Sequence, residues 1–369
     1  MDKISIKGFE VTAIKNYDSL IDRGIITVKE RQNNYICISG NLISTIKIGK
    51  TRYFDDFFYT LTQYGGVYGK MQLSINDEEY HNLNCYTIKE YIDKIEEAKE
   101  FLSDEYGITV NMRHIMYDSL EINKTIVINE KFSKYSRPLN LMMYLLPNKL
   151  QLKEVDYMGK SLQSKKVTDY KKKPETYMKI SKGKTLSIKI YDKTEQLKNF
   201  KILVEHNYLR FEITLFGAKK IDEKLGTNNV WELTDEMVNQ FFHEFIEKNV
   251  LEAYTKYCEN RGPQLRKIIK ENYKPKCSWT KNVLEQIANL EIDNGLPLVL
   301  DVNEIIQELD KVCKFSTRSS KYYARKTLQE KCEGKLKVLA NQDYEKMLEI
   351  IEKLIINYIC LFDYLFISS

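Results

Sequence analysis

The stretches Ser187-Ile-Lys-Ile-Tyr-Asp-Lys-Thr-Glu-Gln-Leu-Lys198 and Leu209-Arg-Phe-Glu-Ile-Thr-Leu215 decide the fold that this sequence predicts. In both, polar and apolar residues alternate with the period of two that is typical of a β-strand. In the second stretch we expect an apolar buried face and an open polar face, the latter made of Arg210, Glu212 and Thr214. Two neighbouring strands of this kind would place a tyrosine, a lysine and a carboxylate on one polar face of a sheet.

The first strand supplies candidate catalytic residues. Tyr191 and Lys193 are two residues apart, so strand alternation predicts that their side chains lie on the same face. Tyrosine, with a pKa of about 10, is a weak nucleophile at neutral pH. The Lys193 ammonium would favour the phenolate or neutralise the oxygens of a phosphate, and Glu195 at the strand end could orient Lys193. These residue types are the inventory for phosphoryl transfer through a tyrosyl nucleophile, for which Tyr191 is a candidate, with Tyr170 and Tyr177 as alternatives.

Carboxylates on the neighbouring strands are candidate metal ligands. Glu212 lies mid-strand beside Arg210, and Glu121 lies on another predicted strand with Asn123 on the same face. Asp118, just before that strand, is an additional source of oxygen. Such oxygen donors suit a hard cation such as Mg²⁺ or Mn²⁺. For Glu212, an ion pair with a neighbouring lysine or arginine is an equally good interpretation.

Positive charge is concentrated just before the Tyr191 strand. The chain has a formal net charge of +5, but residues 160–198 contain twelve lysines against four acidic residues. A basic stretch that leads into the candidate strand is where a polyanion such as DNA would be held. We predict DNA contacts by Arg210 and by five lysines of this segment, Lys165, Lys166, Lys171, Lys172 and Lys173. A solvated lysine-rich loop is the alternative interpretation.

The order of the predicted elements indicates the fold class. Strands are predicted at residues 5–14, 24–30, 34–39, 70–75, 109–116 and 120–128. The clearest helix runs from Thr87 to Tyr106, since Thr87 and Glu90 form a capping box and Gly107 follows its end. Another helix is expected at residues 137–146. We predict an α+β fold with a mostly antiparallel sheet and helices on one face, followed by a helical C-terminal region.

Beyond about residue 230 the pattern changes to helices, which predicts two domains, residues 1–230 and residues 231–369. One helix is expected over residues 234–258. Another begins at a capping box, Asp301 to Glu304, and a short turn leads from it into a basic helix. Because this arrangement is typical of a helix-turn-helix, we predict DNA contacts by Arg318, Lys321 and Arg325. A helical hairpin that touches no DNA is the alternative.

The cysteines and the two ends of the sequence bear on its compartment. The seven cysteines are scattered and never spaced as Cys-x-x-Cys, so neither a disulfide framework nor a structural zinc site is expected. The N-terminal residues contain no apolar run of the signal-peptide kind, and the apolar residues 354–367 contain Asp363 and are too few to span a bilayer. We expect a cytoplasmic protein with no membrane partner.

The motifs of both strands resemble those of one family. Tyr-Asp-Lys-x-Glu at residues 191–195, followed by Arg-Phe-Glu at 210–212, is similar to the replication-initiator proteins of filamentous phages and related plasmids, the gene II/X family. Residues 36–42 resemble the early strand of that family with its Ser-Gly turn. Residues 119–123 resemble its central acidic strand, and residues 219–226 the segment that leaves the sheet. The resemblance covers residues 30 to 230.

The resemblance implies a function. Members of that family are rolling-circle nickases of the Rep endonuclease superfamily, whose five-stranded sheet carries the active site on its open face. It implies that Tyr191 cuts one DNA strand at an origin, single-stranded or supercoiled, and leaves a 5′-phosphotyrosyl link and a free 3′-hydroxyl. The implied cofactor is Mg²⁺ or Mn²⁺, with Glu121 and Glu212 as ligands. Recruitment of a host helicase or polymerase stays open.

One departure from the pattern concerns the metal. Many rolling-circle nickases hold the metal with two histidines around one hydrophobic residue, and no His-x-His occurs in this sequence. A metal site would therefore depend on carboxylates, with His114 or His206 as additional ligands.

Two other functions compete with replication initiation: a relaxase for conjugative or mobilisable DNA, and a DNA-binding regulator without catalytic activity.

Overall fold

The structure is a computed structural model of the 369-residue chain. It describes residues 3–30, 42–62, 67–74, 87–135, 138–139, 141–142, 145–146, 154–157, 160–161, 177–182, 185–199, 201–272, 291–292, 296–297, 302–332 and 341–356.

An antiparallel sheet of eleven strands forms the centre of the described structure, in the order β10-β9-β11-β12-β13-β8-β1-β6-β5-β4-β3. The strands are β1 (Lys3–Lys7), β3 (Ile26–Glu30), β4 (Leu42–Ile48), β5 (Asp56–Thr62), β6 (Val67–Ser74), β8 (Met116–Ile128), β9 (Glu154–Tyr157), β10 (Lys160–Ser161), β11 (Tyr177–Lys182), β12 (Leu186–Asp192) and β13 (Asn207–Phe216). Two small pairs lie outside it: β2 (Glu10–Ile14) with β7 (Ile108–Asn111), and β14 (Glu291–Ile292) with β15 (Leu296–Pro297). The predicted α+β class with a mostly antiparallel sheet is confirmed, whereas the five strands implied by the resemblance are too few.

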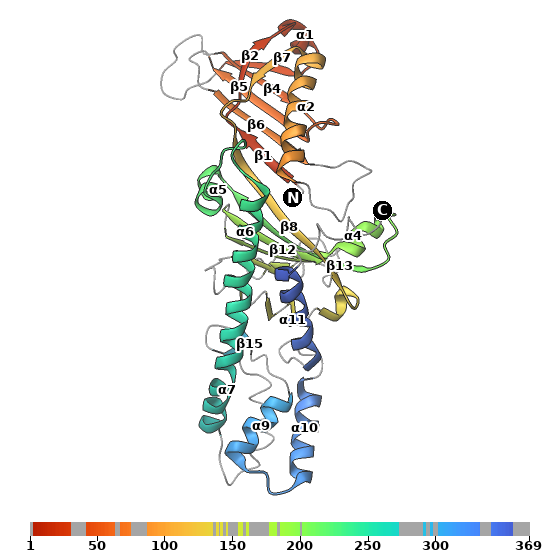
Figure 1. The fold of residues 1–369 in the computed structure, drawn as a ribbon, viewed down its shortest axis with the longest axis vertical. Helices are drawn as coiled ribbons and strands as arrows, with labels where there is room; N and C mark the ends of the chain where they lie inside the picture. The colour runs from red at the N-terminus through yellow and green to blue at the C-terminus, as the bar shows by residue number, and fades with distance from the viewer. Residues whose placement is uncertain are drawn as a thin grey trace.

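Strand β8 holds the two halves of this sheet together. Its 13 residues pair with β1 along its first half and with β13 along nearly its whole length. The register against β1 shifts between Ser5 and Ile6, which leaves Asp118 as an extra residue, as in a β-bulge. Figure 1 shows β8 running from the N-terminal half of the sheet to β12 and β13.

Some predicted strands differ from those observed. Residues 5–14 form two strands instead of one, because the chain turns at Gly8, which has a left-handed φ of 88°. Residues 109–116 are also divided, since β7 ends at Asn111 and β8 begins at Met116. The strands predicted at 24–30, 70–75 and 120–128 correspond to β3, β6 and β8. Residues 34–39 lie outside the described residues.

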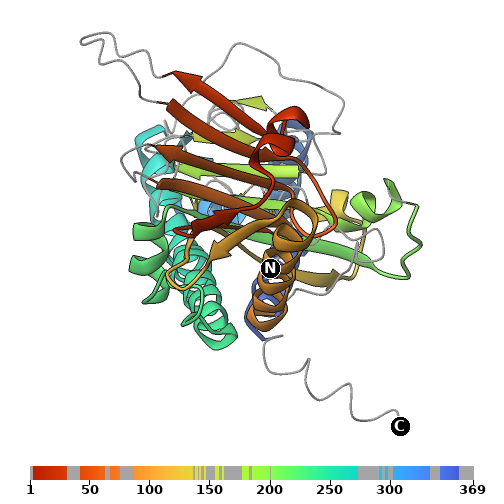
Figure 2. The same cartoon turned by 90° about the horizontal axis from the view of Figure 1, so that it is seen from above.

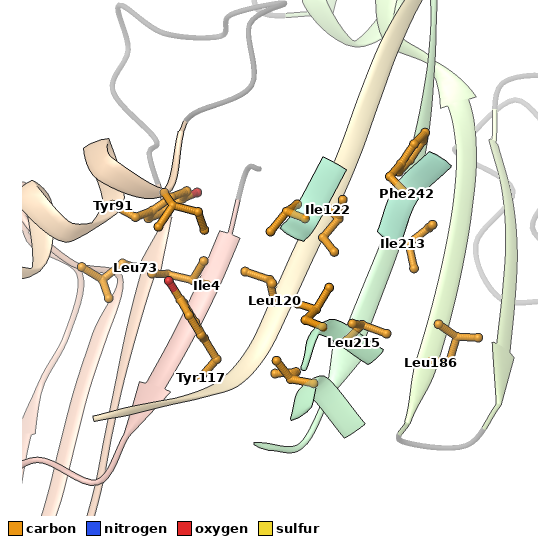
Figure 3. Packing of buried hydrophobic residues seen from close by; sticks show 14 of the residues in the cluster. Ile4, Leu73, Tyr91, Tyr117, Leu120, Ile122, Leu186, Ile213, Leu215 and Phe242 are labelled. Atoms are coloured by element: carbon orange, nitrogen blue, oxygen red, sulfur yellow. The ribbon is translucent and has the colours of Figure 1, made fainter. Parts of the chain in front are cut away.

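Helix α2 (Ile88–Tyr106) forms as predicted. The Thr87 hydroxyl accepts a hydrogen bond from the Glu90 backbone N–H at 3.2 Å, and the Glu90 carboxylate accepts one from the Thr87 N–H at 2.7 Å. Its buried stripe packs over β1 and β6, where Tyr91 lies close to Ile4 and Leu73 (Figure 3). The helix thus covers the apolar face of the N-terminal half of the sheet.

The remaining helices follow β8. They are η1 (Phe132–Tyr135), α4 (Lys193–Asn199), α5 (Ala218–Leu225), α6 (Asp235–Ile246), the π-helical η3 (Glu247–Leu251), α7 (Glu252–Asn272), α9 (Val302–Cys313), α10 (Arg318–Cys332) and α11 (Asn341–Ile356), with α1 (Tyr17–Asp22) near the N-terminus. The described residues of the predicted helix at 137–146 are also helical. No helix in the described parts of the chain is long and apolar enough to cross a membrane.

The helix predicted over residues 234–258 is longer than expected. It begins at the predicted cap, since the Thr234 hydroxyl accepts the Met237 N–H, and it continues through α6, η3 and α7 to Asn272. Pro263 lies inside α7, where proline usually ends a helix because it lacks an N–H. Gly262 and Pro263 are therefore misleading as signals of a helix end.

Helices α5, α6 and α11 complete the core on the apolar face of β8, β12 and β13. Phe242 of α6 meets Phe211 of β13 edge to face, with ring centroids 6.0 Å apart. From α11, the Leu354 carbonyl accepts a hydrogen bond of 2.8 Å from Lys124 Nζ of β8. Figure 2 shows α2, α6 and α11 on the same side of the sheet. The predicted position of helices on one face is therefore confirmed for these three helices.

The predicted boundary at residue 230 does not separate two cores. The main hydrophobic cluster includes Val238 and Phe242 of α6 as well as Ile350 and Leu354 of α11. A second, smaller group of buried residues joins the end of α7 to α9 and α10, namely Leu265, Ile269, Ile305, Ile306, Leu309, Ala324 and Leu328. Figure 1 shows this α9–α10 unit at the end of the molecule remote from β1.

A test of the core packing is Gly69→Ala in β6. An added Cβ would lie 2.7 Å from Tyr59 Cδ2 and 2.8 Å from Phe9 Cε2, and both rings are 1% exposed. Because the buried rings have no room to move, we expect the free energy of unfolding to fall by about 1–3 kcal/mol in urea titration. Gly49→Ala is the control, since no atom lies within 4 Å of its added Cβ. Equal stability of the two variants would contradict this packing.

Candidate functional site

The strand register places the polar residues of three strands in rows on one face. Residues two apart on a strand share a face, and directly paired residues on adjacent strands lie side by side. From β12 through β13 to β8, the rows are Tyr191–Arg210–Thr125, Lys189–Glu212–Asn123 and Ser187–Thr214–Glu121. The prediction that the two motif strands are neighbours is therefore confirmed, and Glu121 and Asn123 lie on the same face as Glu212.

This polar face is buried at β13, contrary to the prediction of an open face. Arg210 is 0% exposed, Glu212 3% and Thr214 7%. Tyr191 and Lys189 on β12 are only partly buried. Alternation predicts which residues share a face, but it does not predict whether that face is covered. Charged residues tolerate such burial when each finds a partner, and the partners here come from adjacent strands.

Lys189 joins the two carboxylates that the sequence assigned to a metal. Its Nζ lies 3.0 Å from Glu121 Oε2, and 3.3 Å and 3.4 Å from the two carboxylate oxygens of Glu212. Of these side chains, Lys189 is 25% exposed, Glu121 13% and Glu212 4%. Lys189 was not among the predicted site residues, although its place two residues before Tyr191 puts it on the same face.

The other predicted metal ligands lie elsewhere. Asp118 accepts hydrogen bonds of 2.9 Å from both Lys7 and Lys70. Burial raises the Asp118 pKa, but these two lysines outweigh burial and hold the pKa below its usual value. His114 and His206 are exposed. Within the described residues, no three histidine, cysteine, aspartate or glutamate side chains gather closely enough to hold a metal ion.

The donor set therefore does not fit an open metal site. A divalent cation between Glu121 and Glu212 would have to displace the Lys189 ammonium, which bonds to both carboxylates. The alternative interpretation of Glu212, an ion pair with a neighbouring lysine, is the one that the geometry supports.

Tyr191 lies directly across from a buried cation. Its Cα partner on β13 is Arg210, and its Cα partner on β11 is Tyr177, one of the alternative nucleophiles. The Arg210 Nε donates a hydrogen bond of 2.8 Å to the Thr125 hydroxyl, which fixes the guanidinium across the row. A phenol beside a preorganised guanidinium is chemically suited to developing negative charge. Tyr170 lies outside the described residues.

The second half of the first motif is a helix and not a strand. The Asp192 carboxylate accepts a hydrogen bond of 3.0 Å from the Glu195 N–H, which makes Asp192 the N-cap of α4. Burial raises the Asp192 pKa, while the N–H groups of Glu195 and Thr194 lower it less strongly. Strand β12 therefore ends at Asp192. An aspartate at a polar strand position and one at a helix cap look alike in an alternating sequence.

Lys193 consequently does not follow the strand alternation that predicted its place beside Tyr191. It is the first residue of α4 and is 7% exposed, and its Nζ donates a hydrogen bond of 2.8 Å to Gln196 Oε1. Glu195 is also in α4. On the face of Tyr191, the pairing of β12 with β13 places the cations Arg210 and Lys189, and the pairing of β12 with β11 places Lys179 beside Lys189.

The predicted DNA contacts divide into three groups. The five lysines Lys165, Lys166, Lys171, Lys172 and Lys173 lie outside the described residues. Arg210 is inside the protein, where a strand lying on the surface does not reach it. Arg318 and Arg325 are exposed on α10, and Lys321 is partly buried because its Nζ bonds to Asp310 Oδ2 at 2.8 Å.

Helices α9 and α10 form the predicted helix–turn–helix pair. In the turn, Lys314 adopts a left-handed φ of 47°, and the Asp310 carboxylate accepts the Phe315 N–H at 3.1 Å. The hydrogen bond from Lys321 holds the Asp310 pKa below its usual value. The Thr317 hydroxyl caps α10 by accepting the Ser320 N–H at 3.1 Å. Two large exposed aromatic residues accompany the arginines on α10, Tyr322 at 62% and Tyr323 at 64%.

Comparisons with known proteins add no assignment. No family model matches the chain, and no curated protein sequence matches it.

A test of the cap separates the structural role of Asp192 from a catalytic one. Asp192→Ala removes the acceptor for the Glu195 N–H, so the free energy of unfolding should fall by about 1 kcal/mol. Asp192→Asn keeps a capping oxygen and should stay within about 0.5 kcal/mol of wild type. Urea titration followed by circular dichroism measures both. If Asn destabilises the protein as much as Ala does, the carboxylate has a role other than capping.

Proposed function

We propose that this chain is a DNA strand-nicking protein that acts through Tyr191, as the rolling-circle initiators that it resembles do. One observation carries the proposal: the partly buried Tyr191 pairs directly across the ladder with the buried Arg210 and shares its strand face with Lys189. A tyrosine whose cross-strand partner is a buried arginine is suited to attack a phosphodiester.

In the proposed reaction, the Tyr191 Oη attacks phosphorus and forms a new Oη–P bond. The P–O3′ bond breaks, and the phenolic proton passes to the departing oxygen through solvent. The products are a 5′-phosphotyrosyl link and a free 3′-hydroxyl that a polymerase can extend. Attack by a 3′-hydroxyl on the phosphotyrosine reverses the step and rejoins the strand.

Arg210 is suited to stabilise charge in this reaction. Its guanidinium is always protonated, and the hydrogen bond to Thr125 already fixes its direction before DNA binds. A buried, oriented cation stabilises a developing phenolate without reorganisation at the moment of reaction. We therefore reassign Arg210 from a DNA contact to a group inside the site.

Lys193 and the metal stay predictions. Lys193, at the start of α4, follows Tyr191 by two residues and would support the phosphate from that side. A role for Mg²⁺ or Mn²⁺ has no ligand set among the described residues, because Glu121 and Glu212 bind Lys189. No step of the proposed reaction is assigned to a metal.

The α9–α10 unit is proposed to bind duplex DNA near the nick. Residues 314–326 contain Lys314, Arg318, Lys321, Arg325 and Lys326 and no acidic residue. A basic helix that follows a short turn can enter the major groove, and its arginines can contact phosphates or guanine edges. Origin DNA is the proposed partner, and a cytoplasmic location agrees with that partner.

Two alternatives predict different behaviour. A relaxase would use the same tyrosine chemistry and differ in its target, a transfer origin, and in its partner proteins. A regulator without catalytic activity is favoured by one observation, the exposed basic surface of α10, which would suffice for binding. Binding by a regulator would be indifferent to the loss of the Tyr191 hydroxyl.

The test of nicking is Tyr191→Phe. Labelled single strands tiled across the DNA that flanks the gene are incubated with protein and Mn²⁺ and separated on a denaturing gel. We expect wild type to form a covalent protein–DNA adduct with one strand, and Tyr191→Phe to form none, because it lacks the attacking oxygen. Tyr208→Phe, at a partly buried position on β13, is the matched control and should retain the adduct.

Other outcomes of this experiment are equally informative. An adduct that survives Tyr191→Phe would move the nucleophile, with Tyr177 and Tyr170 tested next. A strand that wild type binds but never cuts would favour the regulator and sink the nicking proposal.

The test of DNA binding is Arg318→Ala/Arg325→Ala on α10. We expect weaker binding to duplex DNA and a log–log salt dependence that is smaller by roughly 0.9 for each phosphate that the variant no longer neutralises. Lys267→Ala/Lys270→Ala, which removes two exposed charges from α7, is the control with the same change in net charge. Fluorescence anisotropy at several salt concentrations measures both. If the two double variants are weakened equally, α10 is not a specific DNA-binding element.

A further inference from the structure

The strongest unassigned feature is the cation held between Glu121 and Glu212. The two carboxylates lie on different strands, Glu121 on β8 and Glu212 on β13, and both accept hydrogen bonds from the Nζ of Lys189. We infer that Lys189 acts as a tethered cation that occupies the place of a divalent metal ion between these carboxylates and excludes Mg²⁺ and Mn²⁺ from it. This inference concerns cation binding and stands whether or not Tyr191 cuts DNA.

The register of the sheet places Lys189 beside the Glu212 carboxylate. Lys189 is the direct Cα partner of Glu212, and Glu121 lies one row away on β8, two residues before Asn123. Cross-strand partners have Cβ atoms about 5 Å apart, so the backbone itself brings the ammonium to the Glu212 carboxylate. The position of the cation is therefore set by strand pairing and not by a flexible surface side chain.

Distance and charge explain why metal and ammonium exclude each other. Mg²⁺ binds oxygen at about 2.0–2.1 Å and would need the same carboxylate oxygens that now lie 3.0 Å and 3.3 Å from Lys189 Nζ. A second cation at that point would also lie beside the ammonium in a poorly hydrated place, since Glu212 is only 4% exposed. A metal ion and the Lys189 ammonium bound to the same carboxylates would repel each other strongly, because little water is present to screen their charges.

The same argument predicts what removal of the ammonium would reveal. Without Lys189, the ammonium that bonds to both Glu121 and Glu212 would be removed, and Asn123 on the same face adds an amide oxygen. Such a set of hard oxygen donors suits Mg²⁺ or Mn²⁺. Lys189 is thus the residue that decides which kind of cation this part of the sheet holds.

The experiment measures Mn²⁺ binding to the full chain by isothermal titration calorimetry and electron paramagnetic resonance. The variants are wild type, Lys189→Met, Lys189→Arg and Lys189→Met/Glu212→Gln, each checked for folding by circular dichroism. We expect Lys189→Met to gain one Mn²⁺ per chain with a Kd at least tenfold tighter than that of any Mn²⁺ binding by wild type. Lys189→Arg keeps a cation and should gain none, and the double variant should lose the new site.

Two results would overturn the inference. One is a folded Lys189→Met that binds no more Mn²⁺ than wild type does. The other is a wild-type site that disappears in Glu121→Gln, which would place a metal ion on these carboxylates despite Lys189. If Lys189→Met does not fold, the comparison of wild type with Glu121→Gln decides alone: equal Mn²⁺ stoichiometry supports exclusion by Lys189, and a loss of one ion contradicts it.

Discussion

The antiparallel pairing of β12, β13 and β8 is the constraint on which the rest of the site depends. It sets Lys189 against Glu212 and Tyr191 against Arg210, and a slip of one residue would send every one of these side chains to the apolar face. Burial is offset by partners on adjacent strands: Lys189 pairs with Glu121 and Glu212, and Arg210 donates a hydrogen bond to Thr125. Loss of one partner from such a buried group is costly, which makes the register and the charge pattern mutually dependent.

Strand β8 extends this constraint to the whole sheet. Two polar clusters lie along this strand. At its bulge, Asp118 pairs with Lys7 and Lys70. Farther along, Glu121 pairs with Lys189. On the opposite face, α2 and α6 pack on the same strand layer, where Figure 3 labels Tyr91 and Phe242. The α11 helix belongs to this core, so the C-terminal residues of the described chain help to hold the strands that carry the site.

The sequence predicted the parts of the structure that have local signals. The capping box at Thr87 and the alternation around Phe211 identified α2 and β13. It did not reveal that Asp192 caps a helix, because a polar residue after a strand fits either role. The sequence also did not predict that Lys189 pairs with Glu121 and Glu212. These residues lie on strands far apart in the chain, and they meet only when the complete sheet forms.

The long helical run from α6 through η3 to α7 has a consequence for how the two ends of the molecule work together. It starts against β13 at Phe242 and ends where Arg266 bonds to Glu308 of α9 at 3.2 Å. At about 1.5 Å per residue, the run spans on the order of 36 Å between these two contacts. A duplex advances about 3.4 Å per base pair, so this spacing corresponds to roughly one turn of DNA. In the proposed function, this helical run would fix the distance between the DNA bound by the α9–α10 unit and the phosphate attacked by Tyr191.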